Sequence, residues 1–480
     1  MCFYKVFYLL GIVLLIISGF MFIAAVFAWA VLEACGGLFV SGLVCAVFGA
    51  ALILFCNKKR EKFFRPRDSF LLISMAWILA GLAGVLPYLC SGWKFDAALF
   101  ESFSGFTLTG FTMLDDVEAL PKSLLLWRAF SQWLGGAGTL LLFPLLLPYN
   151  GEVIEGRLIQ EQQNRFAMPM RHNAQQKGFF RHVSAVYMLM SAACLLLFSF
   201  SGMEFFQAIC HMLSVVSAGG FSSLNGGIAA FGSTYVECVT AVFLFVSGIN
   251  FYLLFMLFFR RRLRQVLHDQ ELRLYFLILL AASILAGAAL VAAGSGTSGV
   301  FMAVFHSISL LSTGGYAIAN LAAWPTAAQA VLVILLLFGG CMGSLAGGLK
   351  IGRWLLAWRG FKGELTTFFR PGLTQALKYN DRFMDAAIPP RAVFLILLWL
   401  GLAALSALLL TCIGFSWQGA LLAVAAALSN VGPAAISLHP ELAQAFHTPG
   451  ASYILSFLML AGRLELLALL AMFTPAFWRR

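Results

Sequence analysis

Four short stretches, widely separated along the 480-residue chain, repeat one pattern of hydroxyl and glycine residues. They read SGFTLTGFT, SVVSAGGFS, SLLSTGGYA and AALSNVGPA, and they begin at residues 104, 214, 309 and 426. Aligned without gaps, all four have serine or threonine at the fourth position and glycine at the seventh. We call the fourth to seventh positions return loops 1 to 4, which comprise Thr107, Leu108, Thr109 and Gly110; Ser217, Ala218, Gly219 and Gly220; Ser312, Thr313, Gly314 and Gly315; and Ser429, Asn430, Val431 and Gly432.

This pattern suits chemistry done by backbone carbonyl groups. A strand whose successive carbonyls point to one side needs left-handed backbone angles at intervals, which glycine adopts at little cost. Four such strands around one axis would form rings of oxygens that replace the water shell of a cation. The alternative is that the glycines only permit close helix packing. That alternative explains one or two glycines, but not four gap-free copies, so the pattern favours cation binding.

The chain around the return loops is too apolar for a soluble domain. It is 61% hydrophobic and 11% charged, whereas soluble domains are about 25% charged. Many apolar stretches reach the roughly 18 residues that a transmembrane helix needs. The N-terminus lacks a signal-peptide cleavage pattern, so its first apolar run is expected to remain as a helix. The ten cysteines form no metal-ligand cluster and are interpreted as packing residues. The sequence therefore predicts a polytopic membrane protein.

The net charge of +11 is explained by topology rather than by nucleic acid. Lysine and arginine gather in alternate loops, near residues 57–68, 149–182, 260–273 and 350–391. The intervening loops are poor in basic residues. This positive-inside pattern places the basic loops and both termini in the cytoplasm.

Hydrophobic runs predict two N-terminal helices, at 6–31 and 38–56, followed by four longer units. Each unit has a membrane-length helix, a short apolar segment, a return loop and a second membrane-length helix. The first helices are expected at 69–89, 182–200, 274–293 and 393–413, and the second helices at 123–147, 234–259, 327–349 and 452–473. The short segments, at 95–106, 202–216, 298–311 and 416–428, cannot span the bilayer. Asp96 and Ser416 are the expected N-caps of two of these half-helices.

The predicted fold is thus an all-α polytopic membrane protein of about ten spanning helices. Four quasi-repeated helix–half-helix–filter loop–helix units surround a central pore, and two N-terminal transmembrane helices precede them. Half-helices whose C-terminal ends aim at the pore would favour a cation there. The predicted divisions are 1–68 for the N-terminal helices and basic loop, 69–150 for unit 1, 151–260 for unit 2, 261–350 for unit 3 and 351–480 for unit 4.

The return loops resemble the selectivity-filter loops of the Trk/Ktr/HKT superfamily of potassium transporters, and the resemblance covers nearly the whole chain. Further matching motifs are Trp127-Arg128 with Gln132-Trp133-Leu134-Gly135-Gly136, Gly339-Gly340-Cys341-Met342-Gly343-Ser344 with Gly347-Gly348-Leu349-Lys350, and Gly462-Arg463-Leu464-Glu465 with Thr474-Pro475-Ala476-Phe477-Trp478-Arg479. The two extra N-terminal helices favour the bacterial Trk-type pore subunit over the shorter Ktr type.

The resemblance implies potassium uptake across a bacterial cytoplasmic membrane, by a symporter or a channel, with the return loops as the K⁺ filter. It also implies a homodimer surrounded by membrane lipid and a cytosolic regulatory ring that binds nucleotides through Rossmann-like domains. No enzyme activity, organic cofactor or nucleic-acid partner is expected. Glycine at all four seventh positions agrees with potassium selectivity, since sodium-passing relatives tend to have serine in the first loop.

Residues 339–350 contain five glycines within a predicted helix, and each costs about 1 kcal/mol relative to alanine. The resemblance implies an intramembrane gating loop, with Gly343, Gly347, Gly348 and Lys350 in it and Arg463 facing it from the pore. The alternative is close helix packing. Leu345-Ala346 stand where relatives usually have threonine and a further glycine, which leaves the details of gating open.

Several charged or polar residues have two interpretations. Arg463, expected midway along the last helix, could instead pair with Glu465, although residues two apart on a helix point in different directions. Arg128 could snorkel to the interface or have a functional role. Structural hydrogen bonding is favoured over proton transfer for two histidines at matching places, His211 and His306. Three acidic residues after return loop 1 could concentrate cations or simply be solvated; they are Asp115, Asp116 and Glu118.

Two other classes of function also use interrupted helices or buried polar groups in a membrane. A secondary transporter of another fold would also use broken helices, but it should carry more acidic residues in its spans, where Glu465 stands nearly alone. A membrane-embedded enzyme would need convergent catalytic groups, and the seven histidines are scattered. Both alternatives are therefore disfavoured.

Overall fold

The computed structural model describes residues 3–57, 66–142, 172–370, 378–380, 382–383 and 388–478. Most of these residues are helical, and the strands of the described part form one short antiparallel hairpin, β1 (Lys378–Tyr379) and β2 (Arg382–Phe383). Six helices of the described part are long and apolar enough to cross a membrane unbroken. They are α1 (Phe3–Ala30), α2 (Gly36–Asn57), α3 (Pro66–Cys90), α7 (His172–Ser199), α12 (Gln270–Ala292) and α16 (Ile388–Cys412). The predicted all-α polytopic fold is confirmed.

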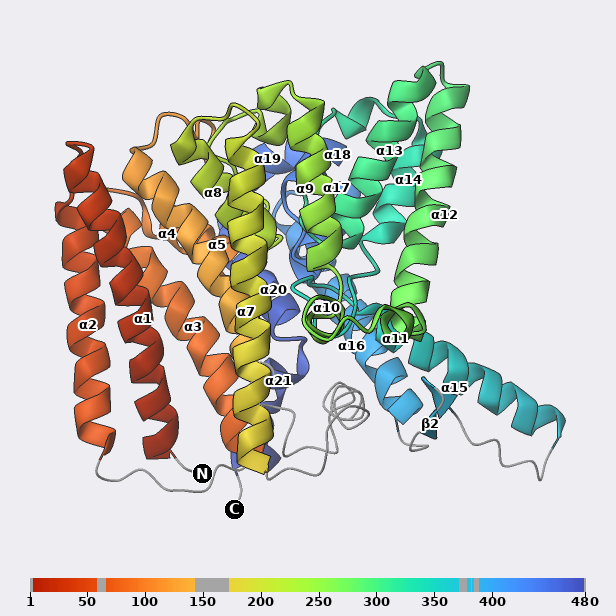
Figure 1. Cartoon of the computed structure of the whole chain (residues 1–480), viewed down its shortest axis with the longest axis horizontal. Helices are drawn as coiled ribbons and strands as arrows, with labels where there is room; N and C mark the ends of the chain where they lie inside the picture. The colour runs from red at the N-terminus through yellow and green to blue at the C-terminus, as the bar shows by residue number, and fades with distance from the viewer. Residues whose placement is uncertain are drawn as a thin grey trace.

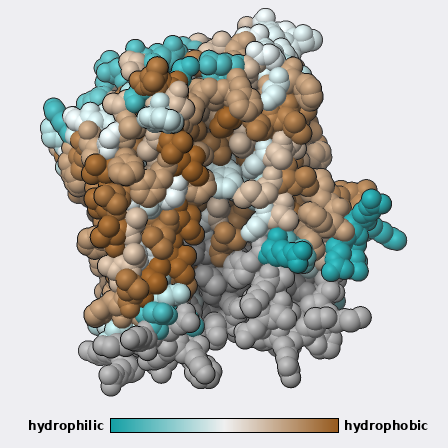
Figure 2. All heavy atoms as spheres, turned by 60° about the vertical axis from the view of Figure 1, so that its left-hand side comes forward, coloured by the Kyte–Doolittle hydropathy of each residue, from teal (hydrophilic) through white to brown (hydrophobic). Residues whose placement is uncertain are grey.

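A belt of hydrophobic side chains crosses one face of the molecule, as expected of a protein in a bilayer. Figure 2 shows this belt in brown, with hydrophilic residues gathered above it. Large apolar residues of the N-terminal helices contribute to its exposed surface, among them Trp29, Phe48 and Phe55. In a bilayer, lipid chains would cover these side chains, whose exposure to water would be unfavourable.

All four predicted half-helices are present. They are α4 (Phe95–Phe106), α8 (Phe205–Val216), α13 (Gly296–Leu311) and α17 (Trp417–Ser429). Ser416 is the N-cap of α17, and its hydroxyl oxygen accepts the Gly419 N–H at 3.2 Å. The Asp96 prediction is wrong, because the N-cap of α4 is Lys94 and Asp96 lies inside the first turn. An acidic side chain in the first turn still interacts favourably with the helix dipole.

The second helices of the units are less regular than predicted. In unit 1, α5 (Lys122–Leu142) is continuous, and residues 143–147 of the prediction lie outside the described part. In unit 2 the chain bends by 107° between α9 (Thr234–Ser247) and α10 (Phe251–Phe258). In unit 3, α14 (Thr326–Leu335) ends well before Lys350. In unit 4, α20 (Ala451–Arg463) is followed by the short α21 (Leu467–Ala471) and α22 (Pro475–Trp478).

Two of these breaks contradict continuous helices, one at a tertiary hydrogen bond and the other at left-handed backbone angles. The Gly248 carbonyl at the first break accepts the Cys341 N–H at 2.9 Å, so it serves unit 3 rather than its own helix. At the break in unit 4, Glu465 and Leu466 both have left-handed angles, with φ of 54° and 61°. Counting the bent pair as one span, the described part contains seven segments of membrane length and composition.

The four units pack in a ring in chain order. Helix α5 of unit 1 packs on α8 of unit 2, and α9 of unit 2 packs on α13 of unit 3. Unit 3 contacts unit 4 through α13 and α18 (Pro433–Leu438), and α20 of unit 4 packs on α4 of unit 1, which closes the ring. The N-terminal pair lies outside it, where α1 contacts α2, α3 and α5. In Figure 1 the half-helices occupy the upper part of the molecule, whereas α10, α11 (Leu263–Leu267) and the projecting α15 (Ile351–Phe369) lie in the lower part.

Candidate cation pathway

The return loops share a backbone conformation as well as a sequence pattern. Residues at the fifth position, Leu108, Ala218, Thr313 and Asn430, have φ of 61°, 56°, 58° and 55°. Their N–H groups donate to the carbonyl at the second position at 3.0–3.2 Å in all four copies. At the seventh position Gly110, Gly220 and Gly315 are also left-handed, with φ of 79°, 88° and 68°. Gly432 departs from this pattern, with φ of −101°.

Neighbouring return loops come so close that only glycine fits between them. A Cβ atom on Gly110 would lie 2.4 Å from the Gly219 carbonyl oxygen, and one on Gly220 would lie 2.9 Å from the Gly314 oxygen. A Cβ on Gly315 would lie 2.8 Å from the Gly432 nitrogen. One on Gly432 would lie 2.3 Å from the Thr109 oxygen. The contacts run from loop 1 to 2, 2 to 3, 3 to 4 and 4 back to 1, so the four loops surround one axis.

Several buried carbonyl oxygens on these loops accept no hydrogen bond from the part of the chain that the structure describes. Among the described residues, none donates to the carbonyls at the fourth and fifth positions of loops 1 to 3, which belong to Thr107, Leu108, Ser217, Ala218, Ser312 and Thr313. Other loop carbonyls are occupied: Gly219 accepts from Gln132 Nε2 at 2.6 Å, and Gly315 accepts from the Ala434 N–H at 2.6 Å. Buried carbonyls without a donor are costly unless water or an ion satisfies them.

Polar side chains behind the loops hold them in register. Gln132 donates to Gly219 of loop 2 and also accepts the Phe221 N–H at 3.2 Å. Asn430 Nδ2 of loop 4 donates to Thr109 Oγ1 of loop 1 at 3.0 Å. Tyr316 donates its hydroxyl to the Phe221 carbonyl at 3.1 Å, which joins the segments after loops 3 and 2. No local sequence pattern predicts these roles for Gln132 or Tyr316.

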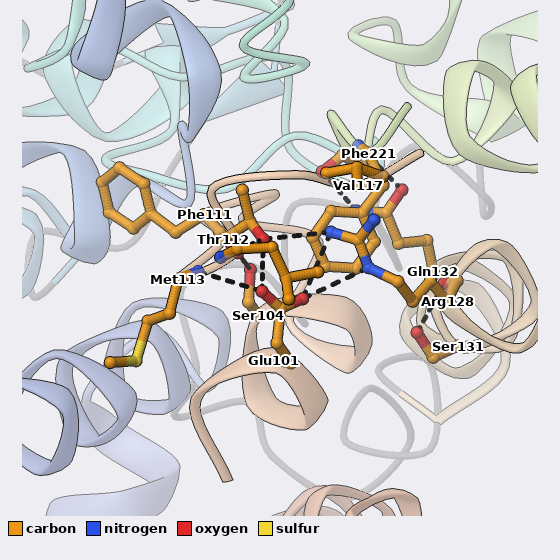
Figure 3. Close-up of polar contacts among 12 residues, drawn as sticks. Glu101, Ser104, Phe111, Thr112, Met113, Val117, Arg128, Ser131, Gln132 and Phe221 are labelled. Carbon is orange, nitrogen blue, oxygen red and sulfur yellow. Dashed lines mark hydrogen bonds and ion pairs between the residues drawn. The ribbon is translucent and has the colours of Figure 1, made fainter. Parts of the chain in front are cut away.

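A buried ion pair supports loop 1 (Figure 3). Arg128 of α5 lies 3.2 Å from the Glu101 carboxylate of α4, and the two side chains are 2% and 0% exposed. Glu101 also accepts the Met113 N–H at 3.0 Å and the Thr112 hydroxyl, both just beyond loop 1. The Arg128 guanidinium stacks 4.1 Å from the centre of the Phe221 ring. Arg128 is therefore buried and does not extend to the membrane interface. Glu101 is a further acidic residue inside the molecule, so the expectation that Glu465 stands nearly alone is wrong.

His211 and His306 make structural hydrogen bonds around return loops 2 and 3, the role that the sequence favours for them. His211 lies 2.8 Å from the Gln207 carbonyl through Nδ1 and 3.0 Å from Ser222 Oγ through Nε2. His306 Nδ1 lies 2.8 Å from the Met302 carbonyl, and its Nε2 accepts the Ile318 N–H at 3.2 Å. Each ring thus ties a half-helix to the chain that leaves the return loop.

Two of the acidic residues after loop 1 also have a structural partner. Asp116 accepts from the Asn225 side chain at 2.8 Å, and Glu118 accepts the Asn225 N–H at 2.9 Å. The hydrogen bond from Asn225 lowers the pKa of the Asp116 carboxyl below its usual value. These contacts join the segments that follow loops 1 and 2, whereas Asp115 remains exposed.

A non-helical segment, residues 336–350, lies directly against loops 3 and 4. We call it the glycine-rich loop. Its Gly347 N–H donates to Thr313 Oγ1 at 2.8 Å, and Ser429 Oγ donates to the Leu336 carbonyl at 2.5 Å. Gly343 and Gly348 have φ of 74° and 68°, which residues with side chains rarely adopt. The predicted interruption of the helix is confirmed, and it begins at Leu336, slightly earlier than expected.

Arg463 reaches the glycine-rich loop from the end of α20. Its Nη1 donates to the Leu345 carbonyl at 2.9 Å, and its Nη2 donates to Thr139 Oγ1 of α5. Arg463 is 3% exposed and is the last residue of its helix rather than its midpoint. Glu465 pairs with Arg353 of α15, so the alternative pairing with Arg463 is wrong. Lys350 is buried too, and it donates to the Ala346 carbonyl within the loop.

Comparison with known proteins connects this arrangement to cation transport. A sequence profile of the TrkH family, described as a cation transport protein, matches residues 37–480. The Trk system potassium uptake protein TrkH of Escherichia coli K12 is 30% identical over 484 residues, which cover 98% of both chains. The protein of the same name from Halomonas elongata is 31% identical over 92% of each chain. The crystal structure of the potassium transporter TrkH from Vibrio parahaemolyticus matches both chains over their full length, with 28% identity and a TM-score of 0.89.

Proposed function

The chain belongs to the TrkH family of cation transport proteins, and we propose that it takes up potassium through the ring of return loops. Its relatives are named as transport proteins, not as enzymes. The pathway would run along the axis that the four loops surround. Potassium is the transported ion in this account, and the sixteen residues of the return loops are its selectivity filter.

The observation that carries this proposal is the closed ring of loops, whose carbonyl oxygens include several with no donor among the described residues. Each pair of neighbouring loops approaches to a distance that excludes a Cβ atom, so the ring is narrow. The free carbonyls at the fourth and fifth positions belong to buried residues. A dehydrated monovalent cation is the ligand whose lost water such oxygens replace. The described residues contain no group of three or more His, Cys, Asp or Glu side chains that could hold a metal ion.

We further propose that the glycine-rich loop closes the pathway below the return loops. Its contact with Thr313 and Ser429 supports this role, because those residues belong to loops 3 and 4. The Arg463 guanidinium would hold the loop in place through the Leu345 carbonyl. A buried positive charge beside the pathway would also oppose a cation, since Coulomb repulsion grows as the local dielectric falls. Gly343, Gly347 and Gly348 would give the loop its close contacts, and Lys350 would stabilise its fold.

We also propose partners and a cellular location for the chain. The relatives' name, Trk system protein, indicates a system with more than one component. We propose a homodimer in the bacterial cytoplasmic membrane, with both termini in the cytoplasm and a nucleotide-binding regulatory ring on the cytosolic side. The basic segments 149–182 and 350–391 are large enough to dock such a ring. The hydrophobic belt of Figure 2 would contact lipid.

Growth of a bacterium that lacks potassium uptake would test the proposal. Cells that express the chain with a cognate regulatory subunit should grow at low external potassium and accumulate radioactive rubidium. A Gly220→Val variant provides the control, because its side chain would collide with Gly314 and Pro433 in the ring. No growth advantage from a well-expressed wild-type chain would contradict potassium uptake.

A further inference from the structure

One buried carboxylate holds both ends of the segment that contacts the return loops. Glu271 lies in the first turn of α12 and is 2% exposed. Its Oε1 accepts the Met342 N–H at 2.6 Å and the Gly352 N–H at 2.9 Å. Met342 lies within the glycine-rich loop and Gly352 just beyond its end, so the two bonds enclose the part of the loop that contains Gly347. A single oxygen therefore closes the base of the loop.

The side chains around the Glu271 carboxylate hold Met342 and Gly352 close together. Met342 packs into a small cluster with Leu356, Tyr379 and Ile388, which come from α15, β1 and α16. A Cβ atom on Gly352 would lie 2.1 Å from the Met342 methyl carbon and 2.9 Å from Glu271 Oε1. The base of the glycine-rich loop is thus fixed by hydrogen bonds and by packing together.

The same turn of α12 is tied to the lower end of the molecule. Asp269 accepts the N–H of Glu271 at 3.1 Å, and it also accepts from Asn380 Nδ2 at 2.8 Å. The Gln270 N–H donates to Asn380 Oδ1 at 3.0 Å, and Gln270 Oε1 accepts from Arg359 of α15 at 2.5 Å. The β1–β2 hairpin, α15 and the start of α12 are therefore one hydrogen-bonded unit, and Glu271 is the point where it meets the glycine-rich loop.

We propose that Glu271 is a positioning residue that anchors the glycine-rich loop in its closed position, and that loss of its two hydrogen bonds lets the loop leave the pathway. This inference rests on the proposed gating function of the loop. Arg463 of α20 donates a hydrogen bond to the loop at Leu345, and Glu271 of α12 accepts one from the loop at Met342. A displacement of the hairpin or of α15 would act on the loop through Glu271, because Asn380 and Arg359 fix the turn that carries it.

Three variants separate the hydrogen bonds from the charge. Glu271→Ala removes the acceptor, Glu271→Gln keeps an acceptor oxygen without the charge, and Glu237→Ala is a control on the first turn of α9, away from the loop. We expect several-fold higher resting rubidium flux into liposomes from Glu271→Ala. Flux from Glu271→Gln and Glu237→Ala should stay near that of the wild type, and selectivity should not change.

Cys341 provides a second readout inside the loop. It is fully buried in the wild type, so N-ethylmaleimide should label it slowly, whereas Glu271→Ala should make it reactive. Labelling of Cys341 is measured by mass spectrometry of its peptide, because the chain has other cysteines. If Glu271→Ala does not fold, Glu271→Asp replaces it, since its shorter side chain cannot bond both N–H groups.

The two readouts distinguish failure of the anchor from failure of the gate. Wild-type flux and a protected Cys341 in folded Glu271→Ala would overturn the anchor, as would a Gln variant that behaves like the Ala variant. A labelled Cys341 without increased flux would keep the anchor and contradict gating by this loop.

Discussion

Single residues decide how closely the return loops can meet. Gly110 has φ of 79°, and a Cβ atom there would lie 2.4 Å from the Gly219 carbonyl oxygen. Two independent reasons therefore require glycine: the left-handed angle, which costs other residues about 1 kcal/mol or more, and the space taken by loop 2. A larger residue must push two loops of the ring apart.

Gly110→Ser should weaken discrimination against sodium. Displaced carbonyls and an added hydroxyl beside the axis would favour a less dehydrated ion. Reversal potentials in mixed potassium and sodium would measure the change. Gly92→Ser is the matched control, because Gly92 has φ of 82° with nothing within 4 Å of its Cβ position. Unchanged selectivity in Gly110→Ser would remove this residue from the filter.

Arg463→Ala should raise resting potassium flux without changing selectivity. The substitution removes both the positive charge and the donor to Leu345. Arg463→Lys should lose most of the closure, because one ammonium group replaces a planar fork that reaches both Leu345 in the glycine-rich loop and Thr139 in α5. Flux into liposomes would measure both variants. Lower flux from a normally expressed Arg463→Ala protein would leave Arg463 as a structural anchor.

Arg128→Ala should destabilise the protein through the Glu101 carboxylate that it leaves buried and unpaired. Removing one partner of a buried pair typically costs about 3–5 kcal/mol. We expect a clear drop in the melting temperature of the detergent-purified protein. Lys122→Ala is the control, since its ion pair with Glu204 is exposed on both sides. Equal melting temperatures for the two variants would show that the Glu101 pair does not support the fold.

The sequence predicted which residues form the loops, but not every role within them. The repeated glycines form a visible pattern, because a Cβ atom at any of the four positions would collide with a neighbouring loop. Leu108, Ala218 and Thr313 have left-handed angles without any intrinsic preference for them, so only the surrounding packing explains them. Asn430 could have been anticipated, because asparagine tolerates this region. Glu101 and Arg128 are 27 residues apart, and no local pattern predicts that they pair.

At the scale of elements, length and composition predicted the half-helices, whereas tertiary contacts decide where the longer helices break. The half-helices are too short to span, and apolar enough to be buried. The break after Ser247 depends on a hydrogen bond between Gly248 and Cys341, and one sequence window contains neither the partner nor the bend. The five glycines at 339–350 do predict the break in unit 3, because the free-energy cost of each glycine in a helix adds up within one segment.

Deletion of residues 343–346 should increase flux and make it less dependent on a regulatory partner. These residues include the Gly343 carbonyl that accepts the Phe251 N–H at 3.1 Å and the Leu345 carbonyl that binds Arg463. Without them the loop cannot remain beneath loops 3 and 4. Rubidium uptake with and without the regulatory subunit would measure the effect. A folded, dimer-sized deletion variant with low flux would argue against a gating loop.

At the scale of the whole molecule, the ring is closed by contacts between the first and last units and is supported from outside. Helix α20 packs on α4, which brings loop 4 beside loop 1. The N-terminal pair joins this ring through Glu33, whose carboxylate accepts the N–H groups of Lys122 and Ser123 at 2.8 and 2.9 Å. It thus caps α5, the helix that carries Arg128 and Gln132 behind the loops.

Ion flux through the purified chain in liposomes tests the central claim most directly. An imposed potassium gradient, with a fluorescent reporter of membrane potential, would show whether this polypeptide alone conducts the ion and in what preference. The account predicts potassium and rubidium flux well above that of sodium, abolished by Gly220→Val and increased by deletion of residues 343–346. Equal flux of potassium and sodium through a folded wild-type chain, or none from either the wild type or the deletion variant, would contradict it.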